Sequence, residues 1–291
     1  MNENKFVCFN GEFMREEKAN ALLPVSYIGS YYFIKELMHA SAGKVQFIKA
    51  HFLNITDNMA LLKMKKPPNF SLNYLEEKIQ RLLNANKIFL GAVVKVIIFR
   101  VHDDNYEKAE KDINFMITAS PLEDGHYTLN KKGLIIDVYS EHKKNVNMLS
   151  GIRNTQPLVN VLAGIYKLNH KIDDCVILNE HNHIIETIHS NIILIAGNKL
   201  FTPSISDGCS VDIMRTIALK AAGELKLNIN ENKKLTITDM LTVDEVLLVN
   251  SVSGIRWVVA FKQKRYYNSM ALKLTNQINK MAFDEKENEK D

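Results

Sequence analysis

Residues 151–163 read Gly-Ile-Arg-Asn-Thr-Gln-Pro-Leu-Val-Asn-Val-Leu-Ala, and the third residue of this stretch is Arg153. The apolar residues that follow the proline predict a helix over residues 157–168. An arginine side chain stays protonated at any ordinary pH, so Arg153 brings a fixed positive charge to the start of this helix. It has no uncharged amine that would condense with an aldehyde.

Further short motifs follow in order along the chain. They are residues 184–192 (Ile-Ile-Glu-Thr-Ile-His-Ser-Asn-Ile), 200–203 (Leu-Phe-Thr-Pro), 213–215 (Ile-Met-Arg), 244–246 (Asp-Glu-Val) and 251–255 (Ser-Val-Ser-Gly-Ile). Each motif alone is short enough to arise by chance, but the ordered series is not. With residues 151–163 the series resembles the fold-type IV pyridoxal-phosphate enzymes, the class IV aminotransferases. That family includes branched-chain and D-amino-acid aminotransferases and aminodeoxychorismate lyase, and Leu158 tilts the likeness toward the latter two.

The resemblance implies an α+β fold of two domains with pyridoxal phosphate in the cleft between them, and it assigns roles by position. In the family, the position of Arg153 holds the lysine that forms an imine with the cofactor. The position of Glu186 holds the carboxylate that pairs with the pyridine nitrogen. The remaining cofactor-binding positions correspond to Asn54, Asn191, Asp212, Ile213, Met214, Ser251 and Val252.

Three of these positions depart from the family pattern. Arg153 replaces the lysine, which removes the covalent link. Asn54 stands where the family has a phosphate-binding arginine, and a neutral amide lacks the charge-assisted bidentate contact. Asp212 stands where the family has glycine at a helix start, and a carboxylate there suits the helix dipole but repels a phosphate. All three changes weaken cofactor binding.

We therefore expect a divergent family member that has lost covalent pyridoxal-phosphate chemistry and binds a small anionic ligand in the old cofactor cleft through Arg153. If Arg153 instead pairs with Glu186, the cleft is neutral and structural. Two other functions stay open. The chain is an active transaminase or lyase with a non-standard cofactor site, or it is a non-catalytic partner subunit. The family also implies a homodimer.

Two other groups of side chains could carry chemistry. Lys143 and Lys144 precede the Arg153 stretch and offer replacement amines, but a charged, solvated loop is the favoured interpretation. His181, His183 and His189 are the closest set of histidines. The i, i+2 pair of His181 and His183 would point to one face of a strand, as metal ligands do, but Asn182 suggests a hairpin tip with surface histidines. We therefore predict no metal site. Glu186, which lies close to these histidines, would read as a surface or turn carboxylate without the resemblance.

Composition limits the remaining functions. The chain has 291 residues, of which 46% are hydrophobic and 24% charged, as in ordinary globular proteins. A net charge of +4 without strong clustering gives no reason to expect nucleic-acid binding. The three cysteines lie far apart without a C-x-x-C pair, which argues against disulfides and zinc. No apolar stretch is long enough to span a membrane, and a cytoplasmic location is the expectation.

The expected organisation is a small α+β domain (residues 1–120), a linker (121–125), a larger α+β domain (126–283) and a disordered tail (284–291). The predicted strands are residues 6–10, 45–47, 93–101, 114–118, 133–139, 174–179, 183–186, 192–196, 199–202, 245–250 and 256–261. The predicted helices are residues 51–64, 73–86, 157–168, 212–222 and 269–281. Gly223 is the predicted C-cap of the fourth helix.

Overall fold

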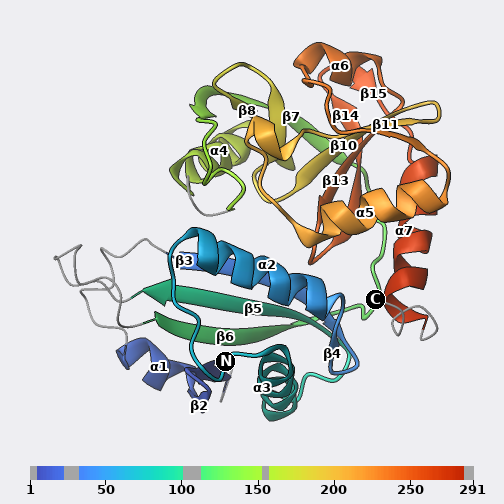
Figure 1. The fold of residues 1–291 in the computed structure, drawn as a ribbon. Helices are drawn as coiled ribbons and strands as arrows, with labels where there is room; N and C mark the ends of the chain where they lie inside the picture. Colours follow the sequence, from blue (N-terminus) through green and yellow to red (C-terminus); the bar gives the residue numbers. More distant parts are fainter. Residues whose placement is uncertain (1–4, 23–32, 101–112, 153–156, 285–291) are drawn as a thin grey trace. The chain divides into compact units, whose positions relative to one another are not determined.

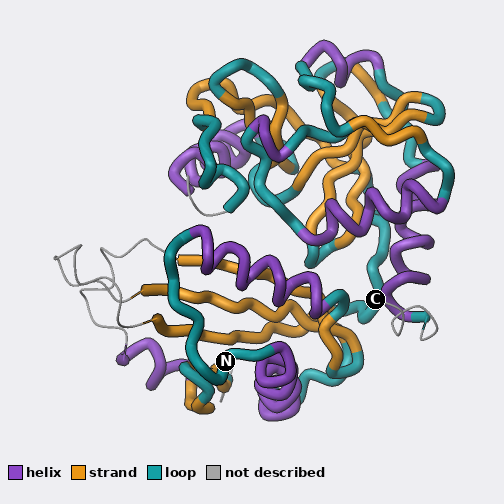
Figure 2. Tube along the Cα trace, in the orientation of Figure 1, coloured by secondary structure: helices purple, strands orange, loops and turns teal. Residues whose placement is uncertain are grey.

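The computed structural model describes residues 5–22, 33–100, 113–152 and 157–284 (Figure 1). The chain divides into two compact units, Met1–His126 and Tyr127–Asp291. Each unit combines helices with one β-sheet (Figure 2). The predicted α+β class is therefore confirmed. The predicted tail beyond Asp284 and the Arg153 position both lie outside the described residues.

The N-terminal unit contains a six-stranded sheet of order β2-β1-β6-β5-β3-β4, in which the described pairings are antiparallel. Its strands are β1 (Phe6–Phe9), β2 (Glu12–Arg15), β3 (Phe33–Ser41), β4 (Lys44–Val45), β5 (Gly91–Arg100) and β6 (Ile113–Leu122). Its helices are α1 (Glu16–Leu22), α2 (Ile48–Leu61) and α3 (Leu72–Ala85). Helix α2 packs against β3, and α3 packs against β1 and β6.

Helical periodicity explains how α2 and α3 attach to this sheet. The buried residues of α3 recur every three or four positions, and they are Leu75, Ile79, Leu82 and Leu83. The Ser71 side chain accepts a hydrogen bond from the Tyr74 N–H and so caps the first turn of α3. Helix α2 starts three residues earlier than predicted, because Phe47 in the left-handed region turns the chain directly into the helix.

The C-terminal unit contains a nine-stranded mixed sheet of order β12-β11-β10-β13-β14-β7-β8-β9, with β15 paired to β14. Its strands are β7 (Leu134–Lys144), β8 (Asp174–Asn179), β9 (Ile184–Thr187), β10 (Asn191–Ala196), β11 (Lys199–Phe201), β12 (Asn228–Asn230), β13 (Glu245–Asn250), β14 (Gly254–Phe261) and β15 (Lys264–Arg265). Its helices are α4 (Pro157–His170), the 3₁₀ turn η3 (Ile205–Asp207), α5 (Ile213–Glu224), α6 (Ile237–Thr242) and α7 (Ser269–Phe283).

Strand β8 separates two hydrophobic clusters, which explains its continuous apolar sequence. Val176 and Leu178 belong to one cluster, whereas Cys175 and Ile177 belong to the other. Successive side chains of a strand point to opposite faces, so a strand buried on both faces reads as an apolar run rather than an alternation. Helix α4 covers the second face and contributes Ala163 to that cluster.

Two predicted boundaries differ from the structure, at the start of the linker and at the end of α5. Pro121 and Leu122, placed in the linker, pair with β5 as the end of β6. In the described residues, β1 pairs with β6 only at Met116 and Ile117. Pro121 lies beyond this pairing, so β1 does not need a hydrogen bond from the N–H that proline lacks. Gly223 lies inside α5 and is not its C-cap. Lys226 takes the left-handed position after this helix instead.

The turn between β13 and β14 depends on Gly254. Its φ is +67°, and a Cβ built there would lie 2.8 Å from Cδ1 of the buried Tyr127 ring. Tyr127 has little room to move, because its N–H and C=O both bond to the Asn279 side chain. A side chain at position 254 would therefore meet both an unfavourable φ and a rigid neighbour.

We expect Gly254→Ala to lower the free energy of unfolding by about 1–3 kcal/mol, because the substitution adds a clash to the cost of positive φ. Gly197→Ala is the matched control, since Gly197 has a φ of +56° with no atom within 4 Å of its built Cβ. Urea unfolding of both variants gives the comparison. Equal losses in the two variants would show that contact with Tyr127 contributes nothing.

Candidate functional site

Glu186 lies inside the C-terminal unit and not at its surface. It belongs to β9 opposite Ile177 of β8, and only 2% of the residue is exposed. The interpretation as a surface or turn carboxylate is therefore wrong. Because β8 and β9 are both covered by apolar clusters, an ionised carboxylate at this position requires charged or hydrogen-bonding partners.

Lys144 supplies the charged partner. Its Nζ donates to Oε1 of Glu186, and Lys144 is 6% exposed. The predicted solvated loop is wrong for this residue, although the neighbouring Lys143 is exposed. Strand β7 shifts register between Tyr139 and Lys144, and the shift returns the last residue of the strand to the protein interior.

Ser210 completes the coordination of Glu186. Both its N–H and its hydroxyl donate to Oε2, and the N–H distance is 2.9 Å. Burial by itself raises the pKa of Glu186, but the Lys144 ammonium and the hydrogen bonds from Ser210 outweigh burial and hold the pKa below its usual value. The carboxylate is therefore ionised at neutral pH, and each of its two oxygens has a donor.

Asn191, the next predicted site residue, fixes the other side of Ser210. Its Nδ2 donates to the Ser210 carbonyl at 2.8 Å, and its buried Oδ1 has no hydrogen-bond partner in the described part of the chain. Asn191 begins β10, so its position follows from the pairing of that strand with β13. Lys144, Glu186, Ser210 and Asn191 thus form one buried polar network.

Asp212 is the N-cap of α5. Its Oδ1 accepts hydrogen bonds from the Met214 N–H at 2.9 Å and from the Ser251 hydroxyl at 2.7 Å. A carboxylate at this position satisfies a helix N–H and interacts favourably with the positive end of the helix dipole. Ile213, Met214 and Ser251 are also buried, so this part of the predicted site is assembled in the structure.

In the turn after β13, two backbone N–H groups donate to the side chain of Asn250. The N–H of Val252 donates to Oδ1 of Asn250 at 3.0 Å, and the N–H of Ser253 donates to the same atom at 2.8 Å. The Asn250 amide in turn donates to the Ser190 hydroxyl at 2.9 Å. Asn250 was not predicted as a site residue, although an asparagine before a Ser-Val-Ser turn is a typical acceptor for turn amides.

Asn54 belongs to α2 of the N-terminal unit, where Glu36 of β3 holds it. Its Nδ2 donates to Oε2 of Glu36 at 2.9 Å, and His51 Nδ1 lies 2.6 Å from Oε1 of the same carboxylate. His51 and Glu36 are both buried. The amide therefore serves a cluster within the N-terminal unit. Glu36 was missed because no strand was predicted over residues 33–41.

Cys209 precedes Ser210 in the chain and is fully buried. Burial raises the pKa of its thiol to about 12, although the nearby Arg215 charge acts in the opposite direction. A thiol with this pKa is not a nucleophile at neutral pH. Among the described residues, no group of three histidine, cysteine or acidic side chains is arranged to hold a metal ion.

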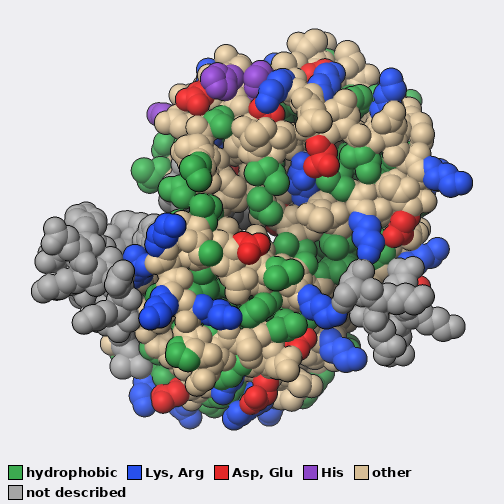
Figure 3. Space-filling view, in the orientation of Figure 1, with side chains coloured by type: hydrophobic (Ala, Val, Ile, Leu, Met, Phe, Trp, Pro, Cys, Tyr) green, Lys and Arg blue, Asp and Glu red, His purple; other side chains and the backbone are tan. Residues whose placement is uncertain are grey.

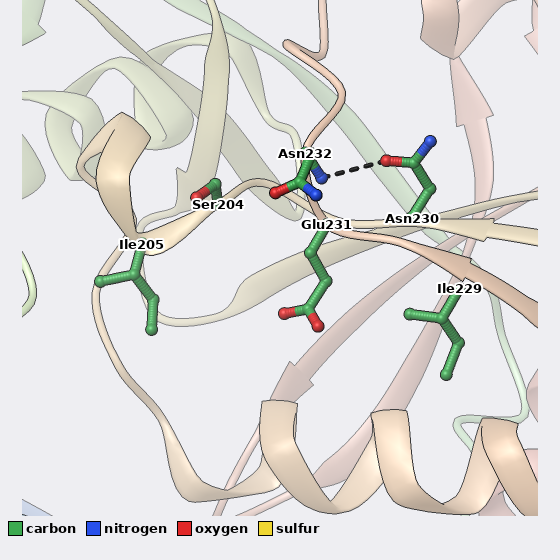
Figure 4. Close-up of a pocket in the computed structure, with 6 residues that line it drawn as sticks. All are labelled: Ser204, Ile205, Ile229, Asn230, Glu231 and Asn232. Carbon is green, nitrogen blue, oxygen red and sulfur yellow. Dashed lines mark hydrogen bonds between the residues drawn. The ribbon is translucent and has the colours of Figure 1, made fainter.

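A surface pocket of about 590 Å³ lies on the same unit, near α5. It is lined by Ser204, Ile205, Ile229, Asn230, Glu231 and Asn232 (Figure 4). Glu231 extends toward α5, where its carboxylate accepts a hydrogen bond of 2.9 Å from Arg215. None of the predicted site residues lines this pocket, so it is separate from the network around Glu186.

Comparison with known proteins places this geometry in a family. The sequence pattern of the amino-transferase class IV family matches residues 34–261. An aminodeoxychorismate lyase from Vibrio harveyi is 30% identical over 108 residues, which are 37% of this chain and 40% of that protein. A branched-chain-amino-acid aminotransferase-like protein 2 from Arabidopsis thaliana is 23% identical over 221 residues, 75% of this chain and 39% of that protein. The match thus spans about two fifths of each of these relatives.

Solved structures share the fold. A branched-chain aminotransferase from Thermoproteus uzoniensis, determined with norvaline, has a TM-score of 0.86 at 18% identity. The alignment covers 98% of this chain and 97% of that protein. A branched-chain aminotransferase from Thermobaculum terrenum in its PLP form has a TM-score of 0.83 at 17% identity. The alignment covers 98% of this chain and 95% of that protein. No helix among the described residues is long and apolar enough to cross a membrane.

The family pattern includes β3 and β14 at its two ends and every described residue of the Glu186 network between them. It extends over more than half of the sequence, and this chain therefore belongs to the class IV aminotransferase family.

Proposed function

We propose that this member of the family works without covalently bound pyridoxal phosphate and binds a small anionic molecule through Arg153. One observation carries the proposal: the Lys144 ammonium already balances the charge of Glu186. Membership of the family by itself implies the pyridoxal-phosphate chemistry of an aminotransferase or lyase. The function of this chain, however, depends on the residues that it has at the site.

The described residues do not fit the cofactor at its ring. In the family, the carboxylate at the Glu186 position pairs with the pyridine nitrogen. In this chain Lys144 donates to one oxygen of that carboxylate, and Ser210 donates twice to the other. A pyridine nitrogen would have to displace the ammonium, which would leave a buried lysine without its partner. Uncompensated buried charges cost about 3–5 kcal/mol.

The described residues do not fit the phosphate either. The N–H of Met214 and the hydroxyl of Ser251 stand at two phosphate-binding positions of the family, and both donate to Asp212. An incoming phosphate would compete with this carboxylate for the same donors and would also be repelled by it. The N–H of Val252, at a third such position, donates to Asn250.

The same contacts support an external anion at Arg153. Glu186 is the carboxylate that would neutralise this arginine if the site had become a structural ion pair. Because Lys144 balances Glu186, the positive charge of Arg153 is not needed there. A guanidinium suits a carboxylate or a phosphate, since its planar fork binds two oxygens at once.

A second function is favoured by the burial of Lys144. A lysine amine inside the site is the group that covalent cofactor chemistry requires, and the chain provides one at position 144 although it has lost the lysine at position 153. On this alternative, the chain is an active transaminase or lyase with a non-standard cofactor site. It requires the ion pair with Glu186 to open, and the experiments below separate the two functions.

We expect the protein as purified, without added pyridoxal phosphate, to carry no pyridoxyl group on any lysine after reduction with borohydride. Arg153→Lys alone should not bind the cofactor stoichiometrically, because Asn54 and Asp212 still weaken phosphate binding by roughly 1.5–3 kcal/mol per lost charged contact. Adding Asp212→Gly to Arg153→Lys should increase labelling. Peptide mass mapping is the measurement. A pyridoxyl group on Lys144 of the unmodified protein would establish the second function instead.

We expect a carboxylate or phosphate compound to raise the melting temperature by mass action. Chorismate-like compounds, keto acids and sugar phosphates are the probes, and thermal shift is the measurement. Arg153→Ala should abolish the stabilisation, whereas Lys143→Ala, which removes an exposed lysine, should not. A stabilising compound that still acts on Arg153→Ala would place the ligand elsewhere. No stabilising compound at all would favour the non-catalytic partner subunit.

We expect Lys144→Met to lower the free energy of unfolding at neutral pH by about 3–5 kcal/mol, because Glu186 becomes a buried charge without a cation. Lys143→Met should change it by less than about 0.5 kcal/mol, as surface substitutions do. Adding Glu186→Gln to Lys144→Met should recover part of the loss. Urea unfolding at several pH values is the measurement.

The pH dependence of these variants has a defined sign. The pKa of Glu186 in the folded protein is below its usual value, so the unfolded state binds its proton first as the pH falls. The pair therefore stabilises the protein above the unfolded pKa of about 4.3, and this contribution disappears as the pH drops through the lower folded value. The gap between Lys144→Met and the unmodified protein should shrink on acidification. A constant gap would show that Glu186 does not cause it.

A further inference from the structure

The strand that carries Lys144 does not run evenly alongside its neighbour. Tyr139 of β7 pairs with Ile177 of β8, and the next pairing joins Lys144 to Asn179. Between these two pairings β7 advances five residues while β8 advances two, so β7 holds three more residues than the ladder needs. An ordinary β-bulge inserts one extra residue. We call residues 140–143 the β7 bulge.

The β7 bulge is exposed, whereas Lys144 directly after it is buried. The backbone of Lys144 is fixed on the side away from the bulge, because its carbonyl accepts a hydrogen bond of 3.0 Å from the N–H of Glu180. On the other side the chain runs through the bulge, where extra residues disrupt the ladder. A contact outside the ladder is therefore needed to hold the β7 bulge in the conformation that brings Lys144 to Glu186.

The Tyr139 hydroxyl supplies such a contact. It shares a hydrogen bond of 2.7 Å with Nδ1 of His142, which lies within the β7 bulge, and the two rings stack with their centroids 6.1 Å apart. A tyrosine hydroxyl donates to a neutral ring nitrogen and accepts from a protonated one. The contact is therefore available to either form of the imidazole.

Tyr139 is a rigid anchor for this contact. Only 1% of the residue is exposed, and it belongs to the same apolar cluster as Ala163 and Cys175. The Tyr166 ring of α4 meets the Tyr139 ring edge-on, with the centroids 5.7 Å apart. Close packing keeps a buried side chain in one rotamer, which fixes the position of its hydroxyl. The Tyr166 hydroxyl donates instead to Oδ2 of Asp137 at 3.4 Å, outside the β7 bulge.

We propose that Tyr139 is a positioning residue for Lys144. Through His142 it closes the β7 bulge, and the closed bulge keeps the Lys144 ammonium on Glu186. An ammonium has no lone pair with which to attack a carbonyl compound, so the closed bulge also keeps this amine unreactive. The inference rests on the charge balance of the proposed function, and it adds the contact by which the chain maintains that balance.

His142 is the residue at which the contact is removed with least disturbance of the core. Its side chain is exposed, and Figure 3 shows histidine side chains at the surface over the place that β8 occupies in Figure 1. His142→Ala deletes the ring nitrogen, whereas His142→Asn keeps a polar group close to the position of Nδ1. Tyr139→Phe removes the same hydrogen bond from the other side. Tyr166→Phe is the matched control, because it deletes a hydroxyl of the same aromatic cluster that does not touch the bulge.

The test is the reactivity of the Lys144 amine in the full chain. Trace acetylation with acetic anhydride, read by tandem mass spectrometry, gives the ratio of acetyl groups on Lys144 to those on the exposed Lys143. We expect this ratio to rise about threefold to tenfold in Tyr139→Phe and in His142→Ala, because one ordinary hydrogen bond shifts a local opening equilibrium by such a factor. The ratio should stay unchanged in Tyr166→Phe and in His142→Asn.

The buried thiols distinguish a local opening from a general loosening. Cys175 and Cys209 should stay unreactive toward a maleimide in His142→Ala, because their cluster remains packed. An unchanged acetylation ratio in His142→Ala overturns the inference, and so does a rise that Tyr166→Phe shares or that reactive thiols accompany. His142→Ala decides the question alone if Tyr139→Phe does not fold. None of these measurements involves a ligand, so their failure is distinct from a failure of the proposed anion to bind.

Discussion

The buried ion pair between Lys144 and Glu186 is the interaction on which the rest of the candidate site depends. Two charges removed from water are tolerated only when each is paired and the remaining lone pairs have donors. Ser210 supplies those donors, and Asn191 in turn fixes the Ser210 carbonyl. The network therefore joins β7, β9 and β10 to the segment that leads into α5. Its members support one another, as hydrogen-bonded groups in a low-dielectric interior do.

Asp212 applies the same principle at the start of α5. The first N–H groups of a helix need acceptors, and either an external anion or a side chain supplies them. In this chain the acceptor is the carboxylate of Asp212, which also takes the Ser251 hydroxyl. Under the proposed function, the chain itself supplies at this helix start the anion that the phosphate supplies in the family. The sequence around this helix start can therefore keep the family pattern, although the Met214 N–H and the Ser251 hydroxyl already donate to Asp212.

Much of the fold was predictable because local patterns determined it. Strand β8 and helix α3 were predicted to within one residue at each end, since an apolar run and a helical repeat are unambiguous. Strand β3 was missed, because its sequence mixes lysine, glutamate and histidine with apolar residues. Glu36 and His51 are compatible with the interior only because they pair with each other, and that contact is invisible until β3 and α2 pack together.

The sequence by itself determined the family, the three departures at Arg153, Asn54 and Asp212, and the apolar character of the helix after residue 156. These are properties of residue type and order. Only the tertiary structure decided which charges meet. Lys144 stands 42 residues before Glu186, and Ser251 stands 39 residues after Asp212. Sheet register and a helix start bring these residues together, and no local pattern encodes a contact between side chains so far apart in the chain.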